Sequence, residues 1–208
     1  GDTLYVLGGY RNGIPSCSMF SFCLSNYSGG WTEVFFPGKP RVQPVCASLF
    51  GNLYIWGGFI PGKESSVLTD GLCYQPASGQ WQVLRAPLTT EGQPLTLTGG
   101  ASVSYGDTLV ICAGGVNRDI FEDAISGRYK KVCESEYLLQ PVEWYHFNDQ
   151  LLAYDVRLGE WIRIGTPSPM LARAGASLVL FGEALFYIGG ELKPGVRTSD
   201  ICRISFQE

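Results

Sequence analysis

The sequence predicts an all-β protein, a β-propeller whose sheets are copies of one four-stranded unit. Three observations support this prediction: a strand-like run that ends in Gly-Gly occurs four times, three of those pairs are followed by a tryptophan, and apolar residues alternate within the intervening runs. A repeat of roughly 50 residues made of short strands is typical of a propeller blade. The composition is globular, with 45% hydrophobic residues.

The glycine pairs are expected to close the second strand of each unit. Two glycines in succession permit positive φ and a close approach of neighbouring backbone. The tryptophans follow the first three pairs after 22, 23 and 46 residues, and a large ring there can fill the wedge between neighbouring sheets. The pairs are Gly8-Gly9, Gly57-Gly58, Gly114-Gly115 and Gly189-Gly190, and the tryptophans are Trp31, Trp81 and Trp161.

Each complete unit is predicted to be an antiparallel meander that resembles the kelch motif. A short strand precedes three of the glycine strands, and a hairpin with a glycine turn leads into the tryptophan strand. We therefore expect three, four, four and three strands in the four units, as in part of a larger propeller. The units span about 1–37, 44–86, 99–166 and 172–206.

The third unit carries an insertion at about 117–148 in which the β pattern stops. Asp119, followed three residues later by Glu122, predicts a helix start, Gly127 predicts its end, and residues 134–139 predict a further turn. A long excursion from a compact domain is usually functional.

Charge and composition exclude several classes of function. A net charge of -4 argues against a nucleic-acid groove, and no apolar run is long enough to span a membrane. The first residues lack the pattern of a signal peptide. One histidine and the lack of a C-x-x-C pair predict neither a metal site nor a cofactor. The seven cysteines are expected to be unpaired and mostly buried, which suits a reducing compartment.

Polar residues gather in two kinds of segment that should share one face. Because strands in a meander alternate in direction, the connection between the second and third strands opens beside the linker into the first strand. Basic groups on such a rim suit a small anionic ligand. The candidates are Arg41, Gln43 and Arg173 in linkers, and Asn117, Glu143, His146, Glu191, Lys193 and Arg197 in connections.

Several of these candidates have an equally good structural interpretation. Arg41 and Arg173 could pair with backbone carbonyls or acidic neighbours between sheets. Glu191 could be the ion-pair partner of Lys193 or Arg197. His146, the one histidine, is more often a packing residue in such an aromatic loop and is held as a reserve candidate.

Longer motifs resemble one family over essentially the whole chain. The kelch-type N-acetylneuraminate mutarotases (epimerases), including cyclically permuted members in bacteria, are similar in these stretches. The most specific match is Gly-Gly-Glu-x-Lys-Pro-Gly-x-Arg-Thr. The stretches are Pro40–Gln43, Gly114–Phe121, Glu143–Asn148, Leu151–Asp155, Arg173–Ala176 and Gly190–Thr198.

The resemblance implies a six-bladed propeller, with about four blades in this chain, that interconverts the α and β anomers of sialic acid. It implies Glu143 as general acid/base, with Glu191 and Lys193 orienting groups or relaying protons. Arginines would hold the sugar carboxylate. The implied substrate-binding residues are Arg41, Gln43, Asn117, Arg173 and Arg197.

The sequence departs from the family pattern at one position. The family places a basic residue directly after the Phe-Asn pair, where this chain has Asp149. His146 or Arg128 is a candidate substitute, and action on another sugar is the alternative. The resemblance suggests the periplasm, whereas the unpaired cysteines suggest the cytoplasm; the oligomeric state stays open.

Two other functions compete with this interpretation. A non-catalytic kelch module would bind a protein or sugar on the same rim, and exposed aromatic residues such as Trp144 and Tyr145 would suit that role. A redox enzyme resembling galactose oxidase would need copper ligands, which a single histidine argues against.

Overall fold

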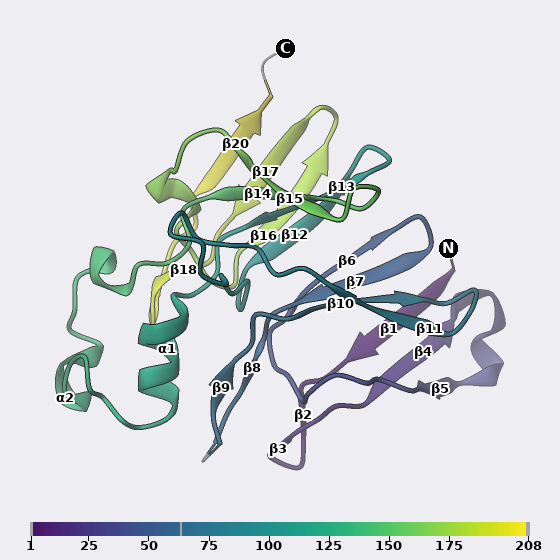
Figure 1. Cartoon of the computed structure of the whole chain (residues 1–208), viewed down its shortest axis with the longest axis horizontal. Coiled ribbons are helices and arrows are strands. Elements are labelled where there is room, and N and C mark those ends of the chain that lie inside the picture. The colour runs from purple at the N-terminus through teal and green to yellow at the C-terminus, as the bar shows by residue number, and fades with distance from the viewer. Residues whose placement is uncertain (1, 63, 207–208) are drawn as a thin grey trace.

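The computed structural model describes residues 2–62 and 64–206. In this part of the chain, four larger antiparallel sheets follow one another from the N-terminal to the C-terminal end (Figure 1). They contain three, four, four and three strands, the numbers expected from the sequence. The all-β prediction is confirmed at the level of small antiparallel sheets with few helices.

The four sheets are numbered in chain order. The first has β1 (Thr3–Leu7), β4 (Met19–Cys23) and β5 (Trp31–Val34); the second has β6 (Val45–Leu49), β7 (Asn52–Trp56), β10 (Gly71–Gln75) and β11 (Gln80–Leu84). The third has β12 (Ala101–Tyr105), β13 (Leu109–Ala113), β14 (Leu151–Asp155) and β15 (Glu160–Ile164); the fourth has β16 (Ser177–Phe181), β17 (Ala184–Ile188) and β20 (Ile201–Ser205).

Three two-stranded ribbons and several short helices connect the strands within the described residues. The ribbons are β2–β3 (Tyr10–Arg11, Ile14–Pro15), β8–β9 (Phe59–Ile60, Ser66–Val67) and β18–β19 (Glu191–Lys193, Val196–Arg197). The helices are α1 (Arg118–Ile125), α2 (Glu134–Tyr137) and the 3-10 turns η1 (Leu24–Gly29), η2 (Val142–Tyr145) and η3 (Pro169–Leu171).

The core lies between successive sheets. Each interface holds its own cluster of buried side chains, and each large apolar side chain removed from water contributes about 1.5–3 kcal/mol. The first strands β6 and β12 are tied together by Ser102 and Ser104, whose hydroxyls donate to the carbonyls of Cys46 and Ser48 at 2.8 and 2.6 Å. Representative pairs are Met19 with Ile55, Trp56 with Val110, and Ile111 with Leu185.

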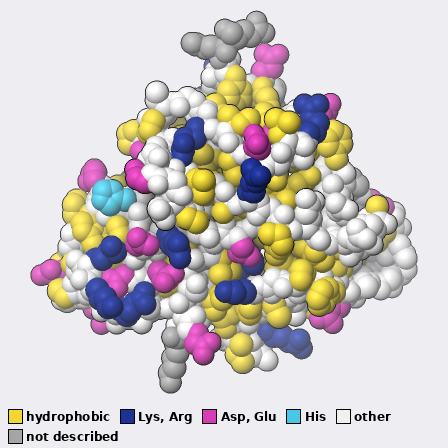
Figure 2. Space-filling model, in the orientation of Figure 1, with side chains coloured by type: hydrophobic (Ala, Val, Ile, Leu, Met, Phe, Trp, Pro, Cys, Tyr) yellow, Lys and Arg dark blue, Asp and Glu magenta, His cyan; other side chains and the backbone are white. Residues whose placement is uncertain are grey.

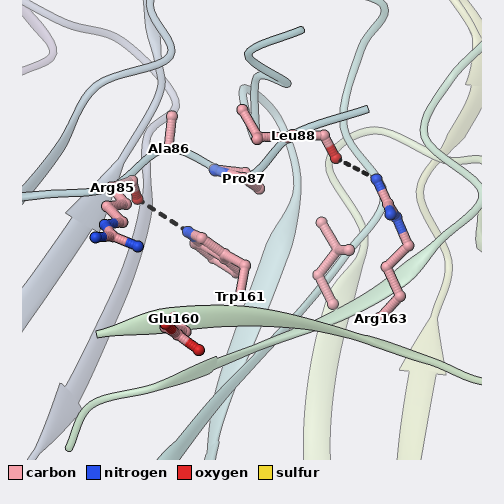
Figure 3. A pocket seen from close by; sticks show the side chains of 8 residues that line it. Arg85, Ala86, Pro87, Leu88, Glu160, Trp161 and Arg163 are labelled. Carbon is pink, nitrogen blue, oxygen red and sulfur yellow. Dashed lines mark hydrogen bonds between the residues drawn. The ribbon is translucent and has the colours of Figure 1, made fainter. Parts of the chain in front are cut away.

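Two of the three repeat tryptophans link neighbouring sheets, as expected. The Trp161 indole N–H donates to the Arg85 carbonyl at 2.9 Å, beside a hollow of about 380 Å³ between β15 and the linker that follows β11 (Figure 3). Trp81 donates in the same way to the Phe35 carbonyl at 2.9 Å. Trp31 is 51% exposed because no described sheet precedes the first one.

The first glycine of each of the first three pairs approaches the backbone of the next linker, and Gly114 shows what this contact requires. Gly114 has φ of +71°, and a Cβ there would collide with the Arg173 carbonyl and the Tyr187 hydroxyl. At Gly9, φ is +81° but a Cβ would have open space. Both positions have a left-handed backbone conformation, but only at Gly114 is there no space for a side chain.

These two glycines give a stability prediction. The Gly114→Ala substitution should lower the free energy of unfolding by about 2–4 kcal/mol, because left-handed strain adds to overpacking. The matched Gly9→Ala change should cost about 1–2 kcal/mol, from strain alone. Denaturant unfolding of both variants measures the difference, and equal losses would contradict the close-approach explanation.

The linkers and the second-to-third connections lie on one face, as predicted. Val42 forms a β-bridge with Phe59, and Ala174 forms one with Glu191. The Val116 N–H donates to the Thr98 carbonyl at 2.9 Å. Ribbons β2–β3 and β8–β9 and both α-helices accordingly lie toward the same end of the molecule in Figure 1. These ribbons are not predicted by the sequence, because strands of two or three residues leave no periodic pattern.

The insertion is helical, but its start was predicted wrongly. Asn117, rather than Asp119, is the N-cap: its Oδ1 accepts the N–H groups of Asp119 and Ile120 at 3.1 Å each. Asp119 lies in the first turn, where a carboxylate interacts favourably with the helix dipole. The helix ends at Ile125, just before Gly127, as expected.

The cysteines are unpaired, but most are not buried. Cys73 and Cys112 are buried, whereas the other five are exposed or intermediate. The prediction of mostly buried thiols is therefore wrong, since side chains alternate between the two faces of a strand. No helix within residues 2–62 and 64–206 has the length and apolar character needed to cross a bilayer.

Candidate active site

Glu143 lines a cavity of about 220 Å³ on the shared face. The 3-10 turn η2 presents its carboxylate, which is exposed. Three segments meet here: the insertion, the linker into the fourth sheet and β18. We refer to it as the Glu143 cavity, and its lining residues are Val142, Glu143, His146, Phe147, Asp149, Pro169, Ala172 and Leu192.

His146 lines both the Glu143 cavity and a second cavity. It ends η2 in the left-handed conformation, with φ of 45° and ψ of 46°, which costs a non-glycine residue about 1–2 kcal/mol. Its backbone N–H donates to the Glu143 carbonyl at 3.3 Å. The second cavity, also about 220 Å³, lies between α1 and residues 89–96; its other polar walls include Thr96, Asn117, Arg118, Asp119 and Asn148.

The side chains of Tyr137, Trp144 and Tyr145 form an aromatic cluster that packs around η2. Tyr145 is 1% exposed, and its hydroxyl donates to the Tyr137 carbonyl. Trp144 packs edge-on against both tyrosines. Burial, reinforced by neighbouring tyrosines, raises the pKa of Tyr137 to about 12, so this cluster stays neutral. The expectation that Trp144 and Tyr145 form an exposed aromatic surface is therefore wrong.

Asn148 fixes the end of the insertion beside the third glycine pair. Its Nδ2 donates to the Gly114 carbonyl at 3.1 Å, and its backbone N–H donates to the Gly115 carbonyl at 2.9 Å. Its Oδ1 accepts the N–H of Gln150 at 3.2 Å. A buried amide with both ends bonded holds its segment firmly.

Strand β18, which carries Glu191 and Lys193, contacts η2, and β19 carries Arg197. Glu191 pairs with Arg197 across the ribbon at 3.2 Å, and the Arg197 side chain is 81% exposed. Lys193 donates from Nζ to the carbonyls of Leu138 and Gln140 at 3.0 and 2.6 Å. Leu192, between Glu191 and Lys193, lines the Glu143 cavity.

The guanidinium groups of the two linker arginines are buried and bonded to other protein groups. Arg41 is fully buried and makes a bidentate pair with Asp70 at 3.2 and 2.8 Å, with a further bond to the Gly57 carbonyl. Arg173 is 1% exposed and donates to the carbonyls of Gly189 and Asp200 at 3.0 and 3.1 Å. These partners favour the structural interpretation of both arginines.

The remaining candidates are more scattered. Gln43 is exposed at the start of the second sheet, with φ of 54°. Asn117 lines the second cavity while its Oδ1 caps α1. Asp149 lines the Glu143 cavity, whereas Arg128 lies near Glu122 and Asp123 at 3.6 and 3.8 Å.

Sequence reasoning gave no role to Arg118, an exposed cation on the wall of the second cavity. Its adjacency to the predicted Asn117 was the one available signal. Figure 2 shows acidic and basic side chains gathered around the insertion, with the histidine in cyan at its edge. Within the described ranges, no three His, Cys, Asp or Glu side chains are arranged to hold a metal ion.

Successive small antiparallel sheets, with a carboxylate-lined cavity on one face, define an all-β repeat protein with a small polar site. The family follows from comparison with known proteins. Residues 1–208 match the family model described as N-acetylneuraminate epimerase (NANM), and the chain belongs to this family. The family resemblance inferred from the motifs is thereby confirmed.

Relatives and a solved structure agree with this assignment. An N-acetylneuraminate epimerase of Haemophilus influenzae (strain 86-028NP) is 33% identical over 211 residues, covering 96% of this chain and 53% of the relative. One from Yersinia enterocolitica is 33% identical over 189 residues, covering 84% and 46%. The structure described as that of YjhT superposes with a TM-score of 0.80 at 28% identity, covering 99% and 60%. The chain thus spans about half the length of these curated relatives.

Proposed function

We propose that this chain provides the reactive face of a sialic acid mutarotase that interconverts the α and β anomers of N-acetylneuraminate. The observation that carries the proposal is the exposed carboxylate of Glu143 at a cavity, within a chain matched by the family model over its whole length. Two cavities sharing His146 as a wall together have the size of a small-molecule site, about 300–1,000 Å³.

The reaction requires only proton transfers around a ring opening. Glu143 takes the proton of the anomeric hydroxyl while the bond from the anomeric carbon to the ring oxygen breaks and a ketone forms. His146, which lines the same cavity, is proposed to give a proton to the departing ring oxygen. After rotation of the open chain, both transfers reverse as the ring closes on the other face.

Arg197 is proposed to bind the carboxylate of the substrate. Its guanidinium is largely exposed, and Glu191 holds it through a 3.2 Å ion pair. A planar guanidinium can bind a carboxylate through two parallel hydrogen bonds. Gln43 and the amide N–H₂ of Asn117 supply further polar contacts, whereas Arg41 and Arg173 hold the linkers in place rather than bind the sugar.

The four sheets are proposed to be four blades of a six-bladed propeller. Strands β6, β12 and β16 lie side by side at the start of their sheets, as the inner strands of blades do. This chain covers 60% of the solved YjhT chain, which suits four blades of six.

The proposal is tested by following freshly released α-N-acetylneuraminate by NMR as it equilibrates to the β anomer. The complete protein that contains this chain should accelerate the approach to equilibrium without changing its final position. A correctly folded protein that leaves the spontaneous rate unchanged would contradict the proposal and leave a non-catalytic sugar- or protein-binding module as the alternative.

A further inference from the structure

The segment that leads into η2 is bonded to the β18–β19 ribbon by the side chain of Lys193. The ammonium of Lys193, on β18, donates to the carbonyls of Leu138 and Gln140, which follow the end of α2. Carbonyls at the end of a helix have no partner within the helix, and a lysine ammonium is well suited to donate hydrogen bonds to them. Gln140 is only three residues before Glu143.

The insertion is also fastened on its other side. The Glu122 carboxylate of α1 accepts the backbone N–H of Val67 on β9 at 3.0 Å, and Phe121 packs edge-on against Phe59 of β8. The insertion therefore bridges the ribbons of the second and fourth sheets. Of the two sides, the Lys193 contact is the nearer in sequence to the reactive carboxylate.

We propose that Lys193 is a positioning residue that sets the location of Glu143 by holding the segment between α2 and η2. This inference rests on the proposed function. Lys193 already donates to two carbonyls, so it acts through the backbone rather than on the sugar. Misplacement of a reacting group by about 1 Å can lower the rate about a hundredfold. A residue that holds the backbone in position can therefore affect the rate as much as a residue that touches the substrate.

The experiment compares Lys193→Met, Lys193→Arg and the control Lys130→Met in the complete protein. Lys130 is exposed on the same insertion. Lys193→Met should lower kcat by about 10- to 100-fold while KM changes little, because the sugar loses no direct contact. Lys193→Arg, which keeps a charged donor, should recover most of the lost kcat, and Lys130→Met should match the wild type.

Hydrogen exchange supplies a readout independent of catalysis. The N–H groups of Trp144 and His146 close η2 by donating to the carbonyls of Pro141 and Glu143. Both should exchange faster in Lys193→Met, while the amides of β13 stay protected.

Two outcomes would overturn the inference: an unchanged kcat in folded Lys193→Met, or a lost kcat with unchanged exchange in η2, which would indicate direct chemistry. Failure of the wild type to accelerate mutarotation would instead count against the proposed function. The exchange comparison would then still decide whether Lys193 holds this segment.

Discussion

Replacing Glu143 by glutamine is expected to slow the protein-catalysed interconversion of sialic acid anomers by about 10²- to 10⁴-fold. Glutamine keeps the shape of the side chain but cannot take a proton from the anomeric hydroxyl. Because Glu143 is exposed, the free energy of unfolding should change by no more than about 0.5 kcal/mol. NMR of the released α anomer gives the rate, and thermal unfolding verifies the fold.

A second carboxylate in the insertion serves as the control for this variant. Glu134 is exposed in the first turn of α2, outside both cavities lined by His146. Glu134→Gln should leave the rate unchanged, because it removes the same charge without removing the proposed acid/base group. If Glu143→Gln keeps the wild-type rate, the acid/base role of Glu143 is wrong and Asp149 becomes the next carboxylate to test.

The sequence predicted the repeated sheets well because the signal is local and periodic. The glycine pairs mark places where backbone approaches backbone, and at Gly114 the structure shows the close contact that excludes a side chain. The helix start was missed by two residues because Asn117 and Asp119 are both good N-caps, and only the geometry decides between them.

The site was predicted only in part, for a physical reason. Topology alone places a residue on a face, and it predicts that Glu143 and Glu191 share one; β18 and η2 are indeed in contact. Topology does not fix whether a side chain points to solvent or into the protein. The ionic partner of Arg41 is Asp70, 29 residues later, and no local sequence pattern indicates such a pair.

The ion pair between the fully buried Arg41 and the partly exposed Asp70 should contribute strongly to stability. Asp70→Ala leaves a fully buried guanidinium without its counter-charge, a situation that typically costs 3–5 kcal/mol. Since the Asp70 side chain is 42% exposed, solvent screens part of the loss, and we expect about 3 kcal/mol. For a chain of this size the midpoint of thermal unfolding should fall by about 6–12 °C.

Asp200 provides a matched control in the fourth sheet. The backbone carbonyls of Asp70 and Asp200 accept equivalent bonds, from the N–H groups of Gly57 and Gly189. The Asp200 carboxylate, however, is 62% exposed and lies 3.8 Å from Arg173, whereas Asp70 lies 2.8 Å from Arg41 and is bonded through both of its carboxylate oxygens. Asp200→Ala should therefore cost less than about 1 kcal/mol. Equal losses in the two variants would show that the buried pair has no special role, and would return Arg41 to the candidates for binding the sugar carboxylate.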